Sequence, residues 1–266
     1  MANLDLTLIQ PDLAWEDPGA NLTSLDQVTA KLPATAELVM LPEMFSTGFS
    51  MRARQLAEPM DGATVSWMLG VARKKNVILT GSVIIRERGR YYNRLVWALP
   101  NGDVAHYDKR HLFSFAGEDA VYRPGDTRVI SMVKGWKVAL SVCYDLRFPV
   151  WLRQPLERGT RYDLLINVAN WPESRSEAWR ALLRARAIEN QCYTAGVNRT
   201  GTDGNGIAYA GGSVVFGPEG ETIAEAGAEA GLVQCVLHKE RIRQVRNQFP
   251  FLDDGDTFSL FAPKIS

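Results

Sequence analysis

The sequence predicts an α/β protein, because short apolar segments of strand length alternate with segments of helical periodicity. No linker, low-complexity segment or fixed-period repeat interrupts the 266 residues. We therefore expect a single domain spanning 1–266, a length that α/β domains often reach undivided. The tail at about 247–266 carries four phenylalanines, and we expect it to dock on the body or on a partner subunit.

The expected strands and helices are short and follow one another closely along the chain. The first strand is predicted at 4–10, where apolar and polar residues alternate, and a helix at 21–32 leads to an apolar run that Pro42 ends. Residues 66–76 have a helical period and a basic end. Further strands are expected within 76–109, with Arg-Gly and Asn-Gly as turns, and within 136–143, 162–172, 192–201, 208–221 and 230–240.

The segment SEAWRALLRARAIENQ, residues 176–191, predicts the clearest helix of the chain. Its apolar side chains are spaced to form one buried face, which we assign to Trp179, Leu182, Leu183, Ala187 and Ile188.

Composition excludes several classes of protein. Lys plus Arg and Asp plus Glu number 30 each, so no net charge favours nucleic acid or an anionic membrane. The N-terminal MANLDLTLIQ is acidic where a signal peptide is basic, and no apolar run approaches the length of a membrane span. We expect a soluble cytoplasmic protein.

Cysteine and histidine usage points away from disulfides and metals. Cys143, Cys192 and Cys235 are odd in number and form no CxxC pair, so reduced thiols are expected. The three histidines show no HExxH or similar spacing. A metal site is therefore not predicted.

Three polar residues each close or follow an apolar, strand-like run: Glu43 after LVMLP, Lys109 after VAHYD and Cys143 after VALSV. Ligands of α/β sheets bind beyond the carboxyl ends of strands. Taken singly, the three have ordinary alternatives: a solvated turn carboxylate, a surface charge and a small buried thiol.

Together the three side chains cover a complete nucleophilic mechanism. A thiol is mostly protonated at neutral pH, so it needs a base, and Glu43 supplies one if its surroundings are dry. The ammonium of Lys109 favours a thiolate and can hold the oxyanion formed when sulfur attacks a carbonyl.

The segments LPEMFSTGF, YDKRHLFSFAGE, SVCYDLRFP and NVANWP resemble, in order and spacing, the motifs of the nitrilase superfamily of carbon–nitrogen hydrolases. RARAIENQCYTAGVNRTG and GGSVVFGPEGE are similar to later segments of that family, so the resemblance runs from about residue 4 to beyond 235. The branch most resembled is that of the omega-amidases, which hydrolyse the terminal amide of 2-oxoglutaramate and related short dicarboxylic monoamides such as succinamate.

The resemblance implies a four-layer α-β-β-α sandwich, a homodimer, and no metal or organic cofactor. It implies a Glu43–Lys109–Cys143 triad that works through a cysteine thioester, with Glu118 positioning the lysine and the substrate. The backbone N–H of Tyr144, directly after the nucleophile, is expected to share the oxyanion with Lys109.

A keto-acid amide carries a carboxylate, so we expect a cation in the pocket. Arg147 is the first candidate, with an internal ion pair to Asp145 or Glu118 as its alternative, and Arg175 is the second, with a surface position as its alternative. Several side chains within the motif segments are expected to line the pocket or else to pack in the core: Met44, Phe45, Phe113, Phe115 and Trp171.

Two other functions remain open at this stage. Another hydrolase of the same superfamily, acting on N-carbamoyl amino acids or nitriles, would share the triad, so only substrate tests separate it from an omega-amidase. A binding protein that had lost the chemistry would keep the fold alone.

Overall fold

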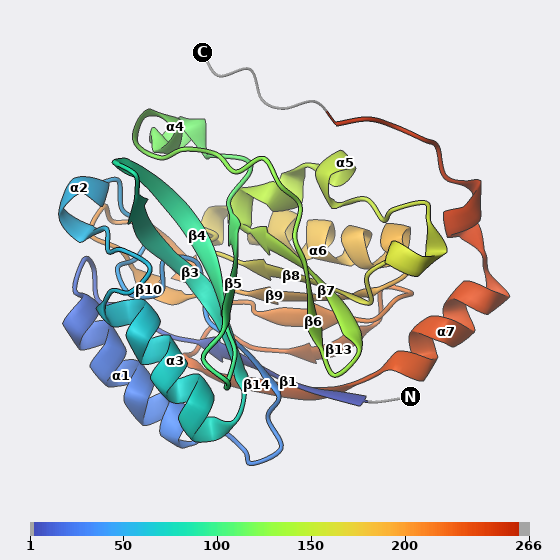
Figure 1. Ribbon diagram of the computed structural model, residues 1–266, viewed down its shortest axis with the longest axis horizontal. Helices are drawn as coiled ribbons and strands as arrows, with labels where there is room; N and C mark the ends of the chain where they lie inside the picture. The colour runs from blue at the N-terminus through green and yellow to red at the C-terminus, as the bar shows by residue number, and fades with distance from the viewer. Residues whose placement is uncertain (1–2, 261–266) are drawn as a thin grey trace.

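Two six-stranded sheets stacked on each other form the centre of the computed structural model, which describes residues 3–260 (Figure 1). The first has the order β14-β1-β2-β3-β4-β5 and the second β13-β12-β9-β8-β7-β6, while β10 and β11 form a separate pair. The strands of the first sheet are β1 (Asn3–Gln10), β2 (Leu38–Met40), β3 (Ile78–Glu87), β4 (Arg90–Ala98), β5 (Val104–Asp108) and β14 (Gly231–His238).

The remaining strands are β6 (Ile130–Val133), β7 (Trp136–Val142), β8 (Leu164–Val168), β9 (Tyr193–Val197), β10 (Thr200–Thr202), β11 (Ala208–Ala210), β12 (Val214–Phe216) and β13 (Thr222–Glu225). Strands β1, β2 and β3 run parallel, as do β7, β8 and β9 in the second sheet. The carboxyl ends of neighbouring parallel strands therefore meet at one edge of each sheet.

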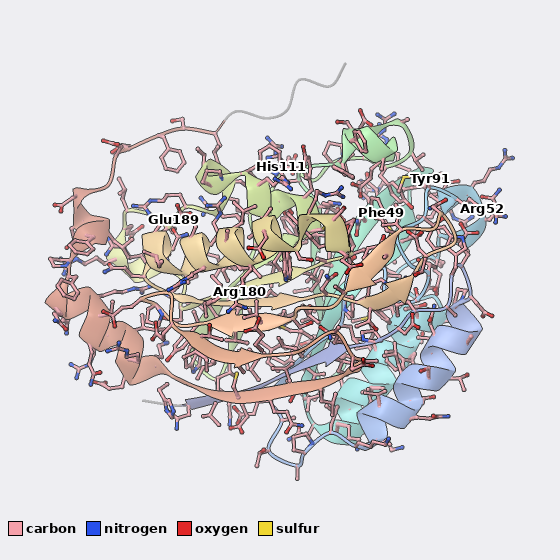
Figure 2. All side chains as sticks on the ribbon, turned by 180° about the vertical axis from the view of Figure 1, so that it is seen from behind. Phe49, Arg52, Tyr91, His111, Arg180 and Glu189 are labelled. Carbon is pink, nitrogen blue, oxygen red and sulfur yellow. The ribbon has the colours of Figure 1, made fainter. Side chains whose placement is uncertain are left out.

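Helices cover the outer faces of both sheets. Figure 1 shows α1 (Pro18–Ala30) and α3 (Ala63–Lys75) beside the first sheet, and Figure 2, from behind, shows α6 (Ser176–Asn190) lying across the second. The predicted α-β-β-α sandwich is confirmed. Short helices complete the fold: α2 (Ala53–Leu56), α4 (Glu118–Val121), α5 (Pro149–Leu152) and α7 (Lys239–Gln248), with 3-10 turns η1 (Ser114–Ala116), η2 (Cys143–Arg147), η3 (Arg158–Thr160), η4 (Glu173–Arg175) and η5 (Phe251–Asp254).

Alternation along β2 illustrates how the layers form. Leu38 and Met40 belong to the core shared with the second sheet, whereas Val39 between them packs with the residues of α1 and α3. Successive side chains of a strand point to opposite faces, so an all-apolar strand serves two cores at once.

Helix α6 packs on the second sheet through Trp179, Leu183 and Ala187, which are buried as predicted. Ile188, assigned to the same face, is instead 48% exposed. The assignment was wrong because Ile188 lies nine positions after Trp179, which at roughly 3.6 residues per turn places it on the opposite side of the helix.

The first part of the C-terminal tail docks on the body. Leu252 is buried, the Arg161 guanidinium donates to its carbonyl, and Gln191 Nε2 donates to the carbonyl of Phe249 at 2.8 Å. Residues 256–260 are exposed, and the rest of the tail lies outside the described residues. Contact with a partner subunit stays a prediction. Over 3–260, no helix combines the length and apolar character needed to cross a bilayer.

Gly196 of β9 lets α6 approach the sheet. A Cβ at this position would lie 2.4 Å from Leu183 Cδ1 and 2.6 Å from Trp179 Cζ2. We predict that Gly196→Ala lowers the free energy of unfolding by about 1–3 kcal/mol, as overpacking does. In Gly70→Ala the new Cβ meets nothing within 4 Å on α3, so this control should be neutral or stabilised. Urea denaturation measures both, and equal effects would contradict the packing argument.

Candidate active site

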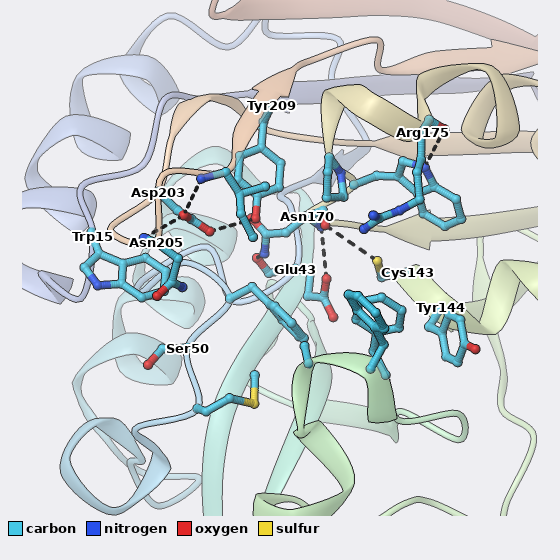
Figure 3. Close-up of a pocket in the computed structure, with 18 of the residues that line it drawn as sticks. Trp15, Glu43, Ser50, Cys143, Tyr144, Asn170, Arg175, Asp203, Asn205 and Tyr209 are labelled. Atoms are coloured by element: carbon cyan, nitrogen blue, oxygen red, sulfur yellow. Dashed lines mark hydrogen bonds between the residues drawn. The ribbon is translucent and has the colours of Figure 1, made fainter.

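The side chains expected at strand exits converge on one cavity of about 660 Å³. Glu43 follows β2, Lys109 follows β5, Cys143 follows β7, and all three line this cavity. Asn170, which follows β8, joins them, and Figure 3 shows it beside Glu43 and Cys143. The fold thus brings together groups that are far apart in the sequence.

Lys109 lies between two carboxylates. Its Nζ donates to Glu43 Oε1 at 2.8 Å and to Glu118 Oε2 at 2.8 Å, and all three side chains are buried. Burial by itself lowers the pKa of Lys109, but the charges of Glu118 and Glu43 outweigh it and raise the pKa above its ordinary value. The ammonium is therefore a permanent charge in this site.

Glu118 stands behind the lysine rather than in the cavity. Its Oε2 also accepts the backbone N–H of Phe113 at 2.6 Å, so it ties the loop after Lys109 to the ammonium. Burial and the nearby charge of Glu43 raise the pKa of Glu118, against the opposing effect of Lys109. The geometry fits the positioning role that the resemblance implies.

Asn93 is a site residue that the sequence did not indicate. Its Nδ2 donates to Glu43 Oε1 at 2.8 Å and to Glu118 Oε1 at 3.0 Å, and its Oδ1 accepts the hydroxyl of Ser82. One fully buried amide thus holds both carboxylates in place. The available signal was a strand-disfavoured Asn in the middle of the strand RYYNRLVWA.

A strained turn presents the cysteine. Cys143 has φ of 41°, a left-handed value that costs a non-glycine residue energy and needs support. Asp145 gives that support, because its carboxylate accepts the backbone N–H groups of Val142 at 3.0 Å and His111 at 2.9 Å and the Tyr107 hydroxyl at 2.8 Å. The turn η2 is thereby fixed at the end of β7.

The Cys143 sulfur lies 3.9 Å from the carbonyl oxygen of Asn170 (Figure 3). Loss of water around the sulfur and the charge of Glu43 raise the pKa of the thiol well above its ordinary value, although Lys109 opposes this. The resting sulfur is therefore a thiol. The nearby carboxylate of Glu43 accepts the Asn170 backbone N–H at 2.9 Å, which fixes it where it can take the proton during attack.

The pocket wall contains most of the aromatic residues expected there. Phe113, Phe115 and Trp171 line the cavity, and so does Tyr144, for which only a role of the backbone N–H was expected. Phe115 is 88% exposed and therefore stands at the mouth. Trp171 is held by Asn198, whose side chain pairs with both its backbone N–H and its carbonyl.

Phe45 does not line the cavity, and that expectation was wrong. The ring is fully buried in the core between the first sheet and its helices, 5.9 Å from the Trp67 ring. The backbone turns at Met44, whose φ is 43°, and this directs Phe45 away from the site. Met44 is also fully buried and fills a gap in the core instead of lining the mouth.

Arg147 lines the cavity together with Arg175. The internal partners considered for Arg147 bind other groups: Asp145 holds His111 and Tyr107, and Glu118 holds Lys109. Arg147 lies over the Trp171 ring instead, with its guanidinium carbon 4.9 Å from the ring centroid. Within residues 3–260 no ion pair is found for it.

Nothing in the described part of the chain gathers three or more His, Cys, Asp or Glu side chains as a metal site. The chemistry available in the cavity is that of a thiol, a carboxylate and an ammonium in a partly apolar enclosure. This set can perform covalent attack on a carbonyl carbon with stabilisation of the resulting oxyanion.

Comparison with known proteins agrees with this chemistry. The family model described as carbon-nitrogen hydrolase matches residues 5–247. The omega-amidase YafV of Escherichia coli is 44% identical over 98% of this chain and 100% of its own length. The 2-oxoglutaramate amidase of Bacillus subtilis is 32% identical over 94% of this chain and 96% of its own.

A solved structure from Xanthomonas campestris, a CN-hydrolase superfamily protein with an arsenic adduct in its active site, has a TM-score of 0.95 and 42% identity, covering 98% of this chain and 100% of that one. The chain belongs to the carbon–nitrogen hydrolase family and resembles its omega-amidase branch.

The raised pKa of Cys143 can be measured by thiolate absorbance in the ultraviolet. We predict that wild type and Cys143→Ser show no difference in thiolate absorbance from neutral pH to about 9, the ordinary value for a thiol. Cys192 and Cys235, whose pKa values burial raises to about 12, do not interfere. A titration assigned to Cys143 and centred below that pH would contradict the thiol form of the resting site.

Proposed function

We propose that the protein is an omega-amidase, which hydrolyses the terminal amide of short dicarboxylic monoamides such as 2-oxoglutaramate and succinamate to the acid and ammonia. The observation that carries the proposal is the buried Glu43–Lys109 pair beside the Cys143 thiol in one cavity. Similarity to an omega-amidase and to a 2-oxoglutaramate amidase supports short dicarboxylic monoamides, rather than other amides, as the substrates.

In the proposed mechanism, Glu43 takes the Cys143 proton as the sulfur attacks the amide carbon. Lys109 Nζ and the backbone N–H of Tyr144 hold the negative charge that develops on the amide oxygen. When the carbon–nitrogen bond breaks, Glu43 gives its proton to the departing nitrogen. Ammonia leaves, and the acyl group remains on sulfur as a thioester.

Water then completes the cycle. Glu43 removes a proton from the attacking water, the tetrahedral carbon forms again within reach of the same donors, and the carbon–sulfur bond breaks as Cys143 regains a proton. Glu118 and Asn93 touch no substrate in this scheme. Asn93 holds Glu43 in place, and Glu118 keeps Lys109 charged throughout.

The substrate carboxylate is proposed to bind Arg147. Its guanidinium lines the same cavity as the sulfur and is not engaged by Asp145 or Glu118. A planar guanidinium suits a carboxylate because two N–H groups can meet both oxygens.

We also propose a cytoplasmic homodimer. All three cysteines are free, which suits a reducing compartment. A groove between α5 and the C-terminal segment exposes Val150, Phe251 and Phe258, and apolar groups gathered in this way often mark subunit contacts. The proposed contact is a second copy of this chain.

A panel of substrates tests the reaction. Ammonia release is expected from 2-oxoglutaramate and succinamate, and Cys143→Ala should abolish it while Cys235→Ala retains it. Release only from N-carbamoyl amino acids or nitriles would replace the proposal with another reaction of the same family. Activity of Cys143→Ala near the wild-type level would remove the proposed nucleophile.

Lys109→Met tests the oxyanion donor. Losing one such donor costs about 3–4 kcal/mol of transition-state stabilisation, so kcat should fall at least a hundredfold. The substitution also leaves two buried carboxylates facing each other, so the free energy of unfolding must be measured alongside. A folded Lys109→Met enzyme with kcat within a few-fold of wild type would contradict the assignment.

A further inference from the structure

The charged groups around the cavity are unevenly distributed along its wall. Lys109 pairs with two carboxylates, those of Glu43 and Glu118, so this cluster carries a net negative charge. At the far end, Arg52 pairs with Glu16 at 2.5 Å. Each cation on this part of the wall therefore has a carboxylate partner.

Asp203 is the remaining acid of the cavity wall, and its carboxylate accepts hydrogen bonds from neighbouring groups of the protein. Its Oδ2 accepts the Tyr209 hydroxyl at 3.0 Å, and its Oδ1 accepts the backbone N–H groups of Asn205 and Ile207 at 2.8 and 3.0 Å. Figure 3 shows Asp203, Asn205 and Trp15 on one side of the pocket, with Cys143 and Arg175 on the other. The acid therefore stands away from the cationic side.

Two guanidinium groups are left over, those of Arg147 and Arg175. Among the described residues, neither has a carboxylate partner or a side-chain hydrogen bond to protein. Each lies over an aromatic ring of the same wall, Arg147 over Trp171 at 4.9 Å and Arg175 over Phe113 at 5.6 Å. The cationic side thus carries two positive charges with no carboxylate partner among the described residues. Arg147 is exposed and Arg175 is half-buried, so an anionic ligand in the cavity can reach both.

The backbone holds Arg175 in this position. Its carbonyl accepts the Trp171 indole N–H at 2.8 Å, and its own N–H donates to the carbonyl of Pro172 at 3.0 Å. The ring under Arg147 is therefore bonded to the residue that carries the second guanidinium. Both arginines thus contact the segment 171–175 of the cavity wall.

We propose that Arg175 is a specificity-determining residue that, together with Arg147, forms a two-guanidinium site for the carboxylate end of the substrate. The inference rests on the proposed function and assigns a second residue to the recognition of the anionic group that these substrates carry at the end opposite the amide. A carboxylate with a neighbouring oxo group offers three acceptor oxygens, enough for both guanidiniums. The dicarboxylate product fits the same site.

Arg175→Gln separates charge recognition from chemistry. Butyramide has a methyl group where succinamate has its carboxylate, and the two compounds are otherwise the same. For Arg175→Gln, KM for succinamate should rise about tenfold to a hundredfold, as expected for loss of charge-assisted hydrogen bonds, while kcat/KM for butyramide stays within about twofold. Arg175→Lys should recover part of the loss, because it restores the charge without the planar fork.

Arg180→Gln is the matched control. This arginine lies further along α6, pairs with Glu225 and is not part of the cavity wall, so its variant should match wild type on both amides. Equal losses on succinamate and butyramide in Arg175→Gln would indicate a structural role and overturn the proposal. Unchanged KM for succinamate would also overturn it.

Binding of succinate, measured by calorimetry, tests the same site without turnover. Its Kd should rise at least tenfold in Arg175→Gln and stay unchanged in Arg180→Gln. If wild type releases no ammonia from succinamate but succinate binding still depends on Arg175, the proposed function fails and the anion site stands. If Arg175→Gln binds succinate as wild type does, or wild type binds none, the anion site fails.

Discussion

One buried ammonium between two buried carboxylates is the interaction on which the site depends. Removing three charged groups from water is costly, and only their mutual contacts offset that cost. Lys109 meets Glu43 and Glu118 at hydrogen-bond distance, and Asn93 donates to both acids. Without the ammonium, two like charges would face each other in a dry interior. The buried cluster is therefore stable only when the ammonium and both carboxylates are present.

The sandwich makes such a set possible because its strands end together. Parallel strands in each sheet deliver Glu43 and Cys143 to the same cavity, and the strand-exit turns at Met44 and Cys143 both have left-handed φ values. Hydrogen bonds to Ser82 and Asp145 hold these turns. Rigid β-structure thus fixes the reacting groups, while the exposed Phe115 lies at the mouth, where substrates enter.

Periodicity predicted the α/β class, and the four-layer sandwich was implied by the family resemblance. The strand-exit groups were predictable because motifs are local signals. Glu43, Lys109 and Cys143 lie in such motifs. Asn93 was missed because its role depends on two carboxylates from distant segments that no local pattern reveals. Phe45 was misplaced because adjacency to Glu43 in the chain says nothing about direction once the backbone turns. The site residues were thus predictable where the sequence signal was local, whereas their hydrogen-bond partners from distant segments were not.

The measurement that tests the central account most directly is mass spectrometry of enzyme quenched in acid during turnover of an amide substrate. The account predicts an adduct equal in mass to the substrate minus ammonia on the peptide containing Cys143, and none in Cys143→Ala. An adduct on Cys192 or Cys235, or steady turnover in which no acylated peptide is ever detected, would contradict attack by the Cys143 sulfur and with it the role of the charge cluster beside it.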